Sequence, residues 1–340
     1  MLSLTDQGPT NATNYHLVVI TTTGQVVRSV TARVPSIGGH LPRFSVAGRS
    51  VYFLDGDRSL KALHGDGSVA TIAELPGSTT DRVAFAVSPD EQRLAFAVLH
   101  YTTPSCPPTQ PCYPKTSTSL RVGSLDGHDA HEIFAGQVVE FPIGWKGGNL
   151  LIAVAQAGFI QNPGEVNPYF AKAYHLVDPA DGRRLYSTSP ACDEPSSLQG
   201  PVNSAGTACQ QNSGNNEVIV ALGWDGSSHE LFRAAVDGYA NAVPPAVLSP
   251  DGREVAAETA AEHRISIFSN GRAQPTAAVG TPAGWFDPGH LLLMQGCCQP
   301  ASQAEVLDVA ANTVTPVTLG VTGSTDPYAP FFASIPPGLS

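Results

Sequence analysis

Two stretches of this 340-residue chain follow one plan and decide the fold that the sequence predicts. They are Ser88–Ala97, with the sequence SPDEQRLAFA, and Ser249–Ala257, with the sequence SPDGREVAA. In each, a turn joins one apolar run to the next. Proline presets φ at the start of the turn, and Asp and Gly tolerate the turn conformations that follow. Two apolar runs separated by such a turn predict an antiparallel β-hairpin.

Weaker copies of the same hairpin occur at Val46–Phe53, Gly144–Leu151 and Phe286–Leu293. A second hairpin with its own polar turn follows each copy, and Asp-Gly or Asn-Gly between apolar runs is a strong hairpin signal. These turns are His64–Gly67, Ser124–Gly127, Asp178–Gly182, Gly223–Gly226 and Ser269–Gly271. The repeating unit is thus four short strands, A to D, which recur about every 36 to 56 residues, and four-stranded units at that spacing are propeller blades.

The repeats predict an all-β chain, a seven-bladed β-propeller of four-stranded antiparallel blades. Six blades are expected at 40–77, 81–136, 138–188, 198–236, 243–279 and 281–320. In the blade at 198–236, the A and B strands are expected in the polar segment Gly200–Asn216. Two strands at the start, Tyr15–Ile20 and Gln25–Ala32, remain with one near the end, Ala329–Ile335. A seventh blade shared by these terminal strands would close the ring and remove its free sheet edges. Six or eight blades are the alternatives, and the domain boundaries are a linker at 1–14 and one propeller domain at 15–336.

The Ser-Pro-Asp-Gly turns resemble those of the WD40-like or TolB-type (PD40) propeller repeats. The motif is sharp at Ser88–Asp90 and Ser249–Gly252, and the blade pattern covers nearly the whole chain. Trp224-Asp225 lies in a turn and does not match the Trp-Asp ending of true WD40 repeats. The resemblance implies a propeller scaffold, usually periplasmic or extracellular, that binds proteins or ligands. It implies no shared catalytic residues.

Composition narrows the range of partners. The chain has 18 basic and 29 acidic residues and a net charge of −11, and its sequence has no basic stripe. Nucleic-acid binding requires clustered Lys and Arg to neutralise phosphates, so a nucleic acid is not an expected partner. An anionic membrane surface is disfavoured for the same reason. No apolar run approaches the length of a membrane span, although an upstream signal or anchor would fit an exported protein.

Six cysteines in turn-rich segments suggest disulfides and an oxidising compartment. They are Cys106, Cys112, Cys192, Cys209, Cys297 and Cys298. Sequence alone does not fix the pairing. The favoured pairs are local, Cys106 with Cys112 and Cys192 with Cys209, which leaves Cys297 for its neighbour Cys298. Free thiols in loops are the alternative. The expected location is extracytoplasmic: secreted, periplasmic or on the cell surface.

The two faces of the predicted disc differ. The A–B and C–D turns that can be identified in the sequence are short, whereas the long insertions fall at B–C or D–A positions. These insertions are Thr102–Thr118, Ala157–Ala171, Ser189–Gln199 and Gln295–Ser302, with Gln210–Asn216 as a further candidate. Long loops on a rigid scaffold commonly carry function, whereas neutral loop growth would be scattered over both faces. The B–C and D–A face is therefore the expected recognition face.

The loops of that face are rich in aromatic and amide side chains, which suit stacking and hydrogen bonding to a protein, peptide or glycan. Packing of each aromatic onto the disc is the alternative. The candidate ligand-binding residues are Tyr101, Tyr113, Phe159, Gln161, Asn162, Asn167, Tyr169, Glu262, His263 and Arg264.

Catalytic and cofactor motifs are not found in the sequence, so no catalytic residue, metal or cofactor is predicted. His128 and His131 could supply two metal ligands, but no third is evident. Glu262 and His263, with His100 and Asp55 or Asp57, could form an acid–base cluster at a central channel. The sequence therefore favours a non-enzymatic binding or sensory propeller. The alternatives are an enzyme, such as a lyase or glycoside-acting propeller, and a scaffold for protein assembly.

Overall fold

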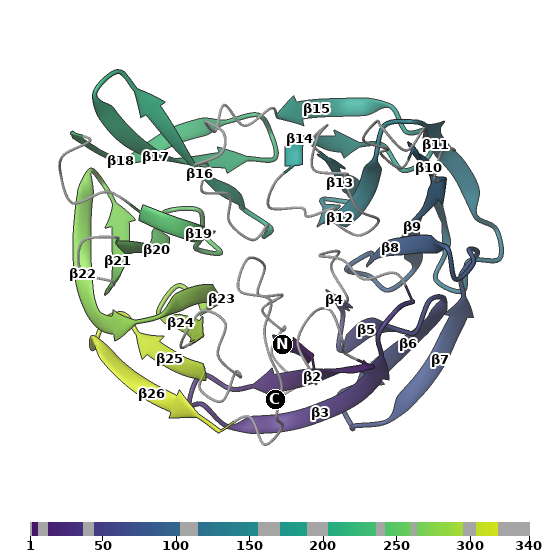
Figure 1. Cartoon of the computed structure of the whole chain (residues 1–340), viewed down its shortest axis with the longest axis horizontal. Helices are drawn as coiled ribbons and strands as arrows, with labels where there is room; N and C mark the ends of the chain where they lie inside the picture. The colour runs from purple at the N-terminus through teal and green to yellow at the C-terminus, as the bar shows by residue number, and fades with distance from the viewer. Residues whose placement is uncertain are drawn as a thin grey trace, which may run out of the picture. The chain divides into compact units, whose positions relative to one another are not determined.

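The computed structural model describes residues 2–5, 13–36, 44–102, 115–155, 171–188, 203–235, 242–259, 264–294 and 304–318. Every regular element among them is a β-strand, and Figure 1 labels these strands in chain order. The described part of the chain holds no helix that is long and apolar enough to cross a membrane. The chain divides into two compact units: Ala32–Ser189 with Pro336–Leu339, and Met1–Thr31 with Pro190–Ile335 and Ser340.

The unit that begins at Ala32 contains three four-stranded antiparallel sheets, each with its strands in sequence order. The first consists of β4 (Phe44–Ala47), β5 (Ser50–Asp55), β6 (Ser59–His64) and β7 (Val69–Glu74). The second consists of β8 (Asp81–Val87), β9 (Arg93–Thr102), β10 (Lys115–Ser124) and β11 (His131–Gly136). The third consists of β12 (Glu140–Lys146), β13 (Asn149–Ala155), β14 (Ala171–Val177) and β15 (Arg184–Thr188). They match the blades predicted at 40–77, 81–136 and 138–188, and are called blades two, three and four below.

The other unit contains two further four-stranded sheets. Blade six is β19 (Ala242–Leu248), β20 (Val255–Thr259), β21 (Arg264–Ser269) and β22 (Arg272–Val279). Blade seven is β23 (Thr281–Asp287), β24 (His290–Met294), β25 (Ala304–Asp308) and β26 (Thr313–Val317). Two three-stranded sheets complete the set. One is β1 (Leu2–Thr5), β2 (Asn14–Ile20) and β3 (Val26–Arg33), and the other is β16 (Gly206–Ser213), β17 (Asn216–Gly223) and β18 (Ser228–Ala235).

The predicted all-β class and the four-stranded antiparallel blades of a β-propeller are confirmed. Six blades are counted in the part of the chain that the structure describes. Six was one of the alternatives that the sequence left open, so the predicted count of seven is not confirmed. The described residues form seven sheets, and two of these have only three strands. The predicted closing strand Ala329–Ile335 lies outside the described residues.

The start of the chain differs from the prediction. Residues 1–14 were expected to be a linker, but Leu2–Thr5 forms strand β1 and pairs antiparallel with β2, with Leu2 opposite Val18. The polar residues around this segment dominated the sequence pattern. The alternation of Leu2 and Leu4 with polar neighbours is nevertheless typical of a short strand. β1 therefore occupies one free edge of β2.

The polar segment Gly200–Asn216 contains β16, in agreement with the B strand that was expected there, but one part of the segment differs from its prediction. Gln210–Asn216 was a candidate loop insertion, yet most of it belongs to β16, which pairs with β17 through Ser213 opposite Asn216. Amide side chains are tolerated there because strand pairing satisfies the backbone hydrogen bonds. β18 is partly exposed along its length, as the outer strands of the complete blades are. β16, β17 and β18 thus correspond to strands B, C and D, and no A strand of this sheet lies within the described residues.

The two Ser-Pro-Asp turns share one hydrogen-bond pattern. Ser249 is fully buried, and its Oγ donates to Asp251 Oδ1 at 2.7 Å and accepts from Glu254 N at 3.0 Å. Ser88 Oγ likewise donates to Asp90 Oδ1 at 2.6 Å and accepts from Arg93 N at 2.8 Å. The hydrogen bond from the serine hydroxyl lowers the pKa of Asp90. Burial acts to raise the pKa of Asp251, but the hydrogen bonds to this carboxylate outweigh burial, so its pKa is lowered as well. The serine therefore links the two sides of the turn.

The fourth residue of each turn has positive φ, which explains the preference for Gly. Gly252 has φ 75°, whereas its counterpart Glu91 has φ 57°, a conformation that strains a residue with a Cβ. Glu91 Oε1 accepts a hydrogen bond from the Tyr52 hydroxyl of blade two at 2.9 Å. That bond and burial raise the pKa of Tyr52. The contact between neighbouring blades offsets the local strain.

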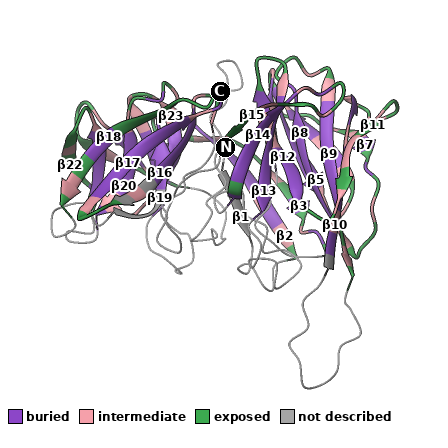
Figure 2. Ribbon diagram, turned by 90° about the horizontal axis from the view of Figure 1, so that it is seen from above, coloured by how far each residue is buried: buried purple, intermediate pink, exposed green. Residues whose placement is uncertain are grey.

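Apolar side chains fill the space between consecutive sheets. Blades two and three share a cluster that includes Tyr52, Leu60, Phe85 and Phe96. Blades six and seven share one that includes Val247, Trp285 and Leu291, and β2 packs through Val18 on blade seven. The inner strands are buried on both faces, while outer strands such as β7 and β22 are partly exposed (Figure 2). Burial of apolar area at about 25 cal/mol per Å² is the main stabilising contribution.

Two tryptophans connect neighbouring blades through hydrogen bonds. Trp145 Nε1 on β12 donates to Ala86 O on β8 at 3.2 Å, and Trp285 Nε1 on β23 donates to Val247 O on β19 at 2.9 Å. Both indoles are buried, and each follows a glycine on the first strand of its blade. The Gly-Trp pair therefore fixes the position of one inner strand against the preceding one.

Replacement of Ser249 tests the turn. We expect Ser249→Ala to lower the free energy of unfolding by about 1 to 3 kcal/mol, because the backbone N–H of Glu254 loses its buried acceptor. Urea denaturation measures this change. Ser228→Ala, at an exposed position at the start of β18, is the matched control and should change stability by less than about 0.5 kcal/mol. Equal effects of the two substitutions would contradict the assignment.

Candidate functional site

Few of the predicted ligand-binding residues lie in the described part of the chain. Tyr101 lies near the end of β9, opposite Thr116 of β10, and is partly buried. Arg264 is the exposed first residue of β21. The other candidates lie outside the described residues: Tyr113, Phe159, Gln161, Asn162, Asn167, Tyr169, Glu262 and His263. The predicted recognition face therefore stays a prediction.

Of the cysteines, only Cys209 is described. It is fully buried in β16 and is disulfide-bonded. Cys106, Cys112, Cys192, Cys297 and Cys298 lie outside the described residues, so the predicted pairings are untested.

The described members of the predicted acid–base cluster, His100, Asp55 and Asp57, have separate partners. Asp57 accepts from Ser36 N at 2.6 Å and from Ser36 Oγ at 2.8 Å. His100 Nδ1 lies 2.8 Å from Asp81 Oδ1. Asp55 Oδ1 accepts from Arg33 Nε at 3.0 Å, and its Oδ2 accepts from Lys61 Nζ at 2.6 Å. Although burial opposes ionisation, these two cations hold the pKa of Asp55 well below its usual range. Asp55 is thus a permanent anion between strands β3 and β6, which suits a structural ion pair and not a proton-transfer group.

A second group of titratable residues is buried in blade four. Glu140 of β12 and His175 of β14 are both about 5% exposed. Glu140 Oε1 accepts from Arg184 Nη2 at 2.9 Å, and Ser187 Oγ lies 2.9 Å from His175 Nδ1. The order Ser187, His175, Glu140 is that of a catalytic relay, which requires a hydrogen bond between the imidazole and the carboxylate. His175 Nε2 is 4.0 Å from Glu140 Oε1, beyond hydrogen-bond distance, so the relay is not formed.

Burial determines the charges in this group. It lowers the pKa of His175 to about 4, with the nearby Arg184 acting in the same direction, so the imidazole is neutral near pH 7. Burial also raises the pKa of Glu140, against the opposing effect of Arg184 and Lys172. The 4.0 Å contact between His175 and Glu140 is therefore not an ion pair at neutral pH, and Arg184 is the counterion of Glu140.

The low pKa of His175 predicts a pH-dependent contribution to stability. Between pH 4 and 6.5 the unfolded chain binds more protons at this site, so stability rises with pH and is lost as pH falls toward 4. We expect the wild-type free energy of unfolding, minus that of His175→Gln, to increase by about 1 to 3 kcal/mol from pH 4 to 7.

Urea denaturation at several pH values measures this difference. Glu140 contributes with the opposite sign, because its raised pKa favours the folded state at low pH, but it is present in both proteins and its contribution largely cancels. His128→Gln, in an exposed turn, is the control. A wild-type-minus-variant difference that is flat with pH would overturn the assignment of a neutral His175.

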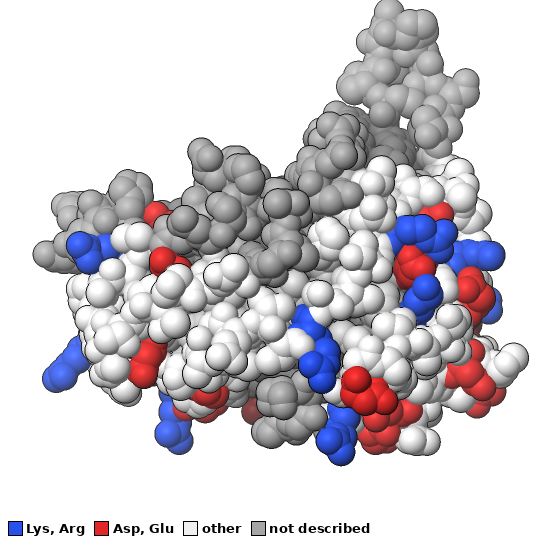
Figure 3. All heavy atoms as spheres, turned by 90° about the horizontal axis from the view of Figure 1, so that it is seen from below, with Lys and Arg blue, Asp and Glu red and all other residues white. Residues whose placement is uncertain are grey.

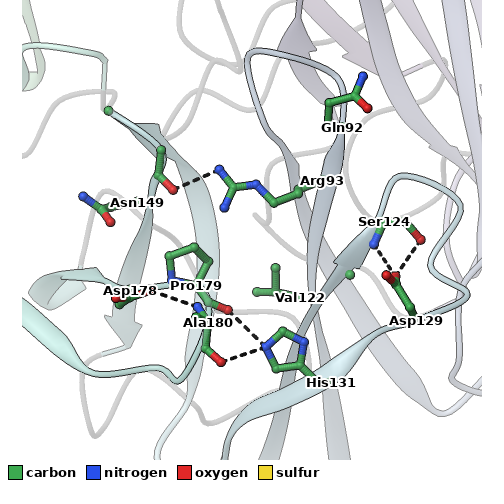
Figure 4. Close-up of a pocket in the computed structure, with 13 residues that line it drawn as sticks. Gln92, Arg93, Val122, Ser124, Asp129, His131, Asn149, Asp178, Pro179 and Ala180 are labelled. Atoms are coloured by element: carbon green, nitrogen blue, oxygen red, sulfur yellow. Dashed lines mark hydrogen bonds between the residues drawn. The ribbon is translucent and has the colours of Figure 1, made fainter.

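A cavity of about 500 Å³ lies between the turns of blades three and four. Figure 4 shows its walls: the β8–β9 turn with Gln92 and Arg93, the β10–β11 turn with Ser124 and Asp129, and the β14–β15 turn with Asp178 to Ala180. Gly147, Gly148 and Asn149 of the β12–β13 turn complete the lining. All four turns are of the A–B or C–D type. The cavity therefore lies on the turn side of these blades, opposite to the side predicted for recognition.

Arg93 is the central cation of this cavity. Its guanidinium Cζ lies 4.7 Å from the centroid of the Trp145 ring, a cation–π contact, and its Nη2 donates to Gly148 O at 3.1 Å. A guanidinium has several N–H donors, and Gly148 O is the one acceptor among the described residues that hydrogen-bonds to this side chain. No carboxylate of the described residues lies within ion-pair distance of Arg93, and Asp90 influences it only at longer range. The Arg93 guanidinium is thus held in place, and its other N–H groups are available to a ligand.

The other walls present acceptors and a histidine. His131 Nε2 lies 3.2 Å from Pro179 O and 3.1 Å from Ala180 O (Figure 4). Because carbonyls only accept, Nε2 carries the proton and does not serve as a metal ligand. Asp129 accepts from the Ser124 hydroxyl and amide, which lowers its pKa. The described residues contain no group of three His, Cys, Asp or Glu side chains that could hold a metal ion. The donors of Arg93 and the acceptors of these walls suit hydrogen bonding to a polar ligand.

Sequence reasoning named parts of this cavity for other reasons. His131 was considered as a metal ligand, and Ser88–Ala97 was recognised as a turn, but Arg93 was not singled out. The signal would have been an arginine three residues after the aspartate of a Ser-Pro-Asp turn, with Trp145 beside the matching turn of the next blade. Sequence alone does not show that the two turns are neighbours.

No protein-family model matches the chain, and no curated protein matches its sequence. Solved structures of similar fold include a functionally unknown protein from Desulfotomaculum acetoxidans, with 12% identity over 95% of this chain and 99% of that one and a TM-score of 0.49. An oligogalacturonate lyase in complex with manganese has 11% identity, 80% and 74% coverage and a TM-score of 0.46. TolB from Acinetobacter baumannii has 13% identity, 85% and 66% coverage and a TM-score of 0.41. At these levels of similarity, the function has to be argued from the residues of this chain.

Proposed function

We propose that this chain is a non-enzymatic recognition module of an exported bacterial protein, and that the cavity between blades three and four binds its ligand. The observation that supports this most is Arg93, which stacks on Trp145 and uses one donor on Gly148 O. A fixed cation with spare donors in a cavity of about 500 Å³ suits a ligand of small-molecule size or the end of a peptide.

The partners of the described carboxylates favour recognition over catalysis. Asp55, Asp81 and Glu140 each have a cationic or histidine partner from the fold. The cavity contributes hydrogen-bond donors and acceptors. Among the described residues that line it there is no cysteine, and the hydroxyl of the one serine, Ser124, is engaged by Asp129 and Asp126. Binding without turnover requires only complementary polar groups on a rigid frame.

An extracytoplasmic location, secreted, periplasmic or cell-surface, is part of this proposal. It rests on the six cysteines and on the disulfide bond of Cys209. An upstream signal or anchor would then deliver the module. No cofactor and no metal are proposed.

The predicted recognition face, with a protein, peptide or glycan as its partner, is kept as a separate proposal. Charge does not point to a polyanionic partner. In the view of Figure 3, Lys and Arg of the described residues lie among Asp and Glu and do not form a continuous basic surface. This agrees with the net charge of −11 and with the proposal that nucleic acid is not a partner.

The test is a thermal-shift screen of the full chain against small polar compounds and short peptides, followed by recovery of each ligand for mass spectrometry. We expect a ligand that raises Tm, is recovered unchanged, and loses its effect with Arg93→Gln, because the substitution removes the charged donors of the cavity. Arg264→Ala, on the separately predicted face, is the control and should leave the shift intact.

Two outcomes would contradict the proposal. Conversion of the ligand to a product would favour an enzyme, and a shift that Arg264→Ala abolishes while Arg93→Gln preserves it would move recognition to the other face.

A further inference from the structure

We infer that the cavity between blades three and four selects a small carboxylic acid that also carries hydroxyl or amine donors. This inference rests on the proposed function, since it names the ligand class of the same cavity. It depends on three features: the unused donors of Arg93, the bare glycine turn beside it, and the acceptors on the opposite walls.

The donor side of the cavity is formed by Arg93 and the β12–β13 turn. The Arg93 guanidinium is oriented by the Trp145 ring and by Gly148 O, which reduces the entropy that a ligand would have to remove. Gly147 and Gly148 have φ values of 57° and 83°, and their N–H groups have no hydrogen-bond acceptor among the described residues. No atom lies within 4 Å of the position that a Gly147 Cβ would take. The turn therefore leaves space for a ligand to approach its backbone.

A planar carboxylate fits this side. Arginine binds carboxylates through two parallel N–H···O bonds, and backbone amides of a turn add further donors for an anion. These charge-assisted bonds are stronger than those between neutral groups, so they provide affinity as well as orientation.

The opposite walls limit the charge of the ligand. Asp129 and Asp178 both line the cavity: Asp129 is held by Ser124, and Asp178 by the backbone N–H of Ala180 and by Arg183 Nη2 at 3.4 Å. Arg183 offsets the charge of Asp178, but Asp129 has no cationic partner among the described residues, so a ligand with two negative charges, such as hydrogen phosphate, meets more repulsion than a monoanion. The remaining lone pairs of the aspartates suit donors at the other end of the ligand. The arrangement favours a monocarboxylate with hydroxyl or amine groups.

Matched pairs of probes test the inference. Gluconate is compared with gluconamide, and triglycine with its C-terminal amide, by isothermal titration calorimetry of the full chain at millimolar ligand concentration. Each pair differs in the carboxylate alone, and the two pairs separate a hydroxy acid from a peptide terminus as its source. We expect at least one carboxylate to bind about ten- to a hundredfold more tightly than its amide. Inorganic phosphate is expected to bind more weakly than that carboxylate.

Variants locate the binding. Arg93→Gln should reduce the affinity of that carboxylate to the level of its amide, and Arg93→Lys should give an intermediate value, because lysine keeps the charge but loses the planar pair of donors. Arg253→Gln is the control, since Arg253 belongs to the equivalent Ser-Pro-Asp-Gly turn in blade six, at the position that corresponds to Gln92, and does not line the cavity. Far-UV circular dichroism and urea denaturation show whether each variant is folded. If Arg93→Gln is not folded, the affinity of Arg93→Lys for the carboxylate decides the test.

The outcomes are distinguishable from those of the proposed function. Equal binding of acid and amide, tighter binding of phosphate, or no binding of either carboxylate overturns the carboxylate inference. If a different ligand from the thermal-shift screen still requires Arg93, the recognition function stands without it. Carboxylate binding that Arg93→Gln leaves unchanged overturns both.

Discussion

The structure depends on the burial of sheet faces between consecutive blades. Within each unit, an inner strand packs against the inner strand of the next blade, and apolar side chains fill the space between them. Trp145 and Trp285 each add an indole hydrogen bond to a backbone carbonyl of the preceding blade. A displacement of one blade would leave these polar groups unpaired in a dry interior, which is costly. Blade positions are therefore fixed, and with them the positions of the turns.

The cavity follows from this constraint. Adjacent blades bring four turns together, and each turn is stabilised by its own bonds, such as Ser88 to Asp90 and Ser124 to Asp129. Because the turns do not need the cavity-facing donors of Arg93 for their own structure, those donors remain for a ligand. Trp145 contributes both to the packing of the blades and to the cavity. Its N–H donates to a backbone carbonyl of blade three, and its ring face orients Arg93.

The fold could be predicted largely from local pattern. Pro-Asp and Asp-Gly turns between apolar runs specify hairpins, and five complete blades lie where the repeats placed them. The pattern failed at Leu2–Thr5, where polar neighbours concealed a strand, and at Gln210–Ser213, where β16 extends into a candidate loop insertion because backbone pairing tolerates the side chains of Gln and Asn. The cavity could not be predicted, because it is formed by turns about 50 residues apart, and periodicity does not show which of them converge. The sequence prediction placed recognition at the long loops, whereas the cavity is formed by short turns.

The central claim, that ligand binds between the turns of blades three and four, can be tested by ¹⁹F NMR of the chain labelled with 5-fluorotryptophan. The chain has three tryptophans, so Trp224 and Trp285 are internal references for Trp145. The account predicts that a ligand which binds the chain shifts the Trp145 resonance and leaves the other two in place, because it alters the guanidinium that stacks on that ring. Binding with an unchanged Trp145 resonance would contradict the account and direct attention to another surface.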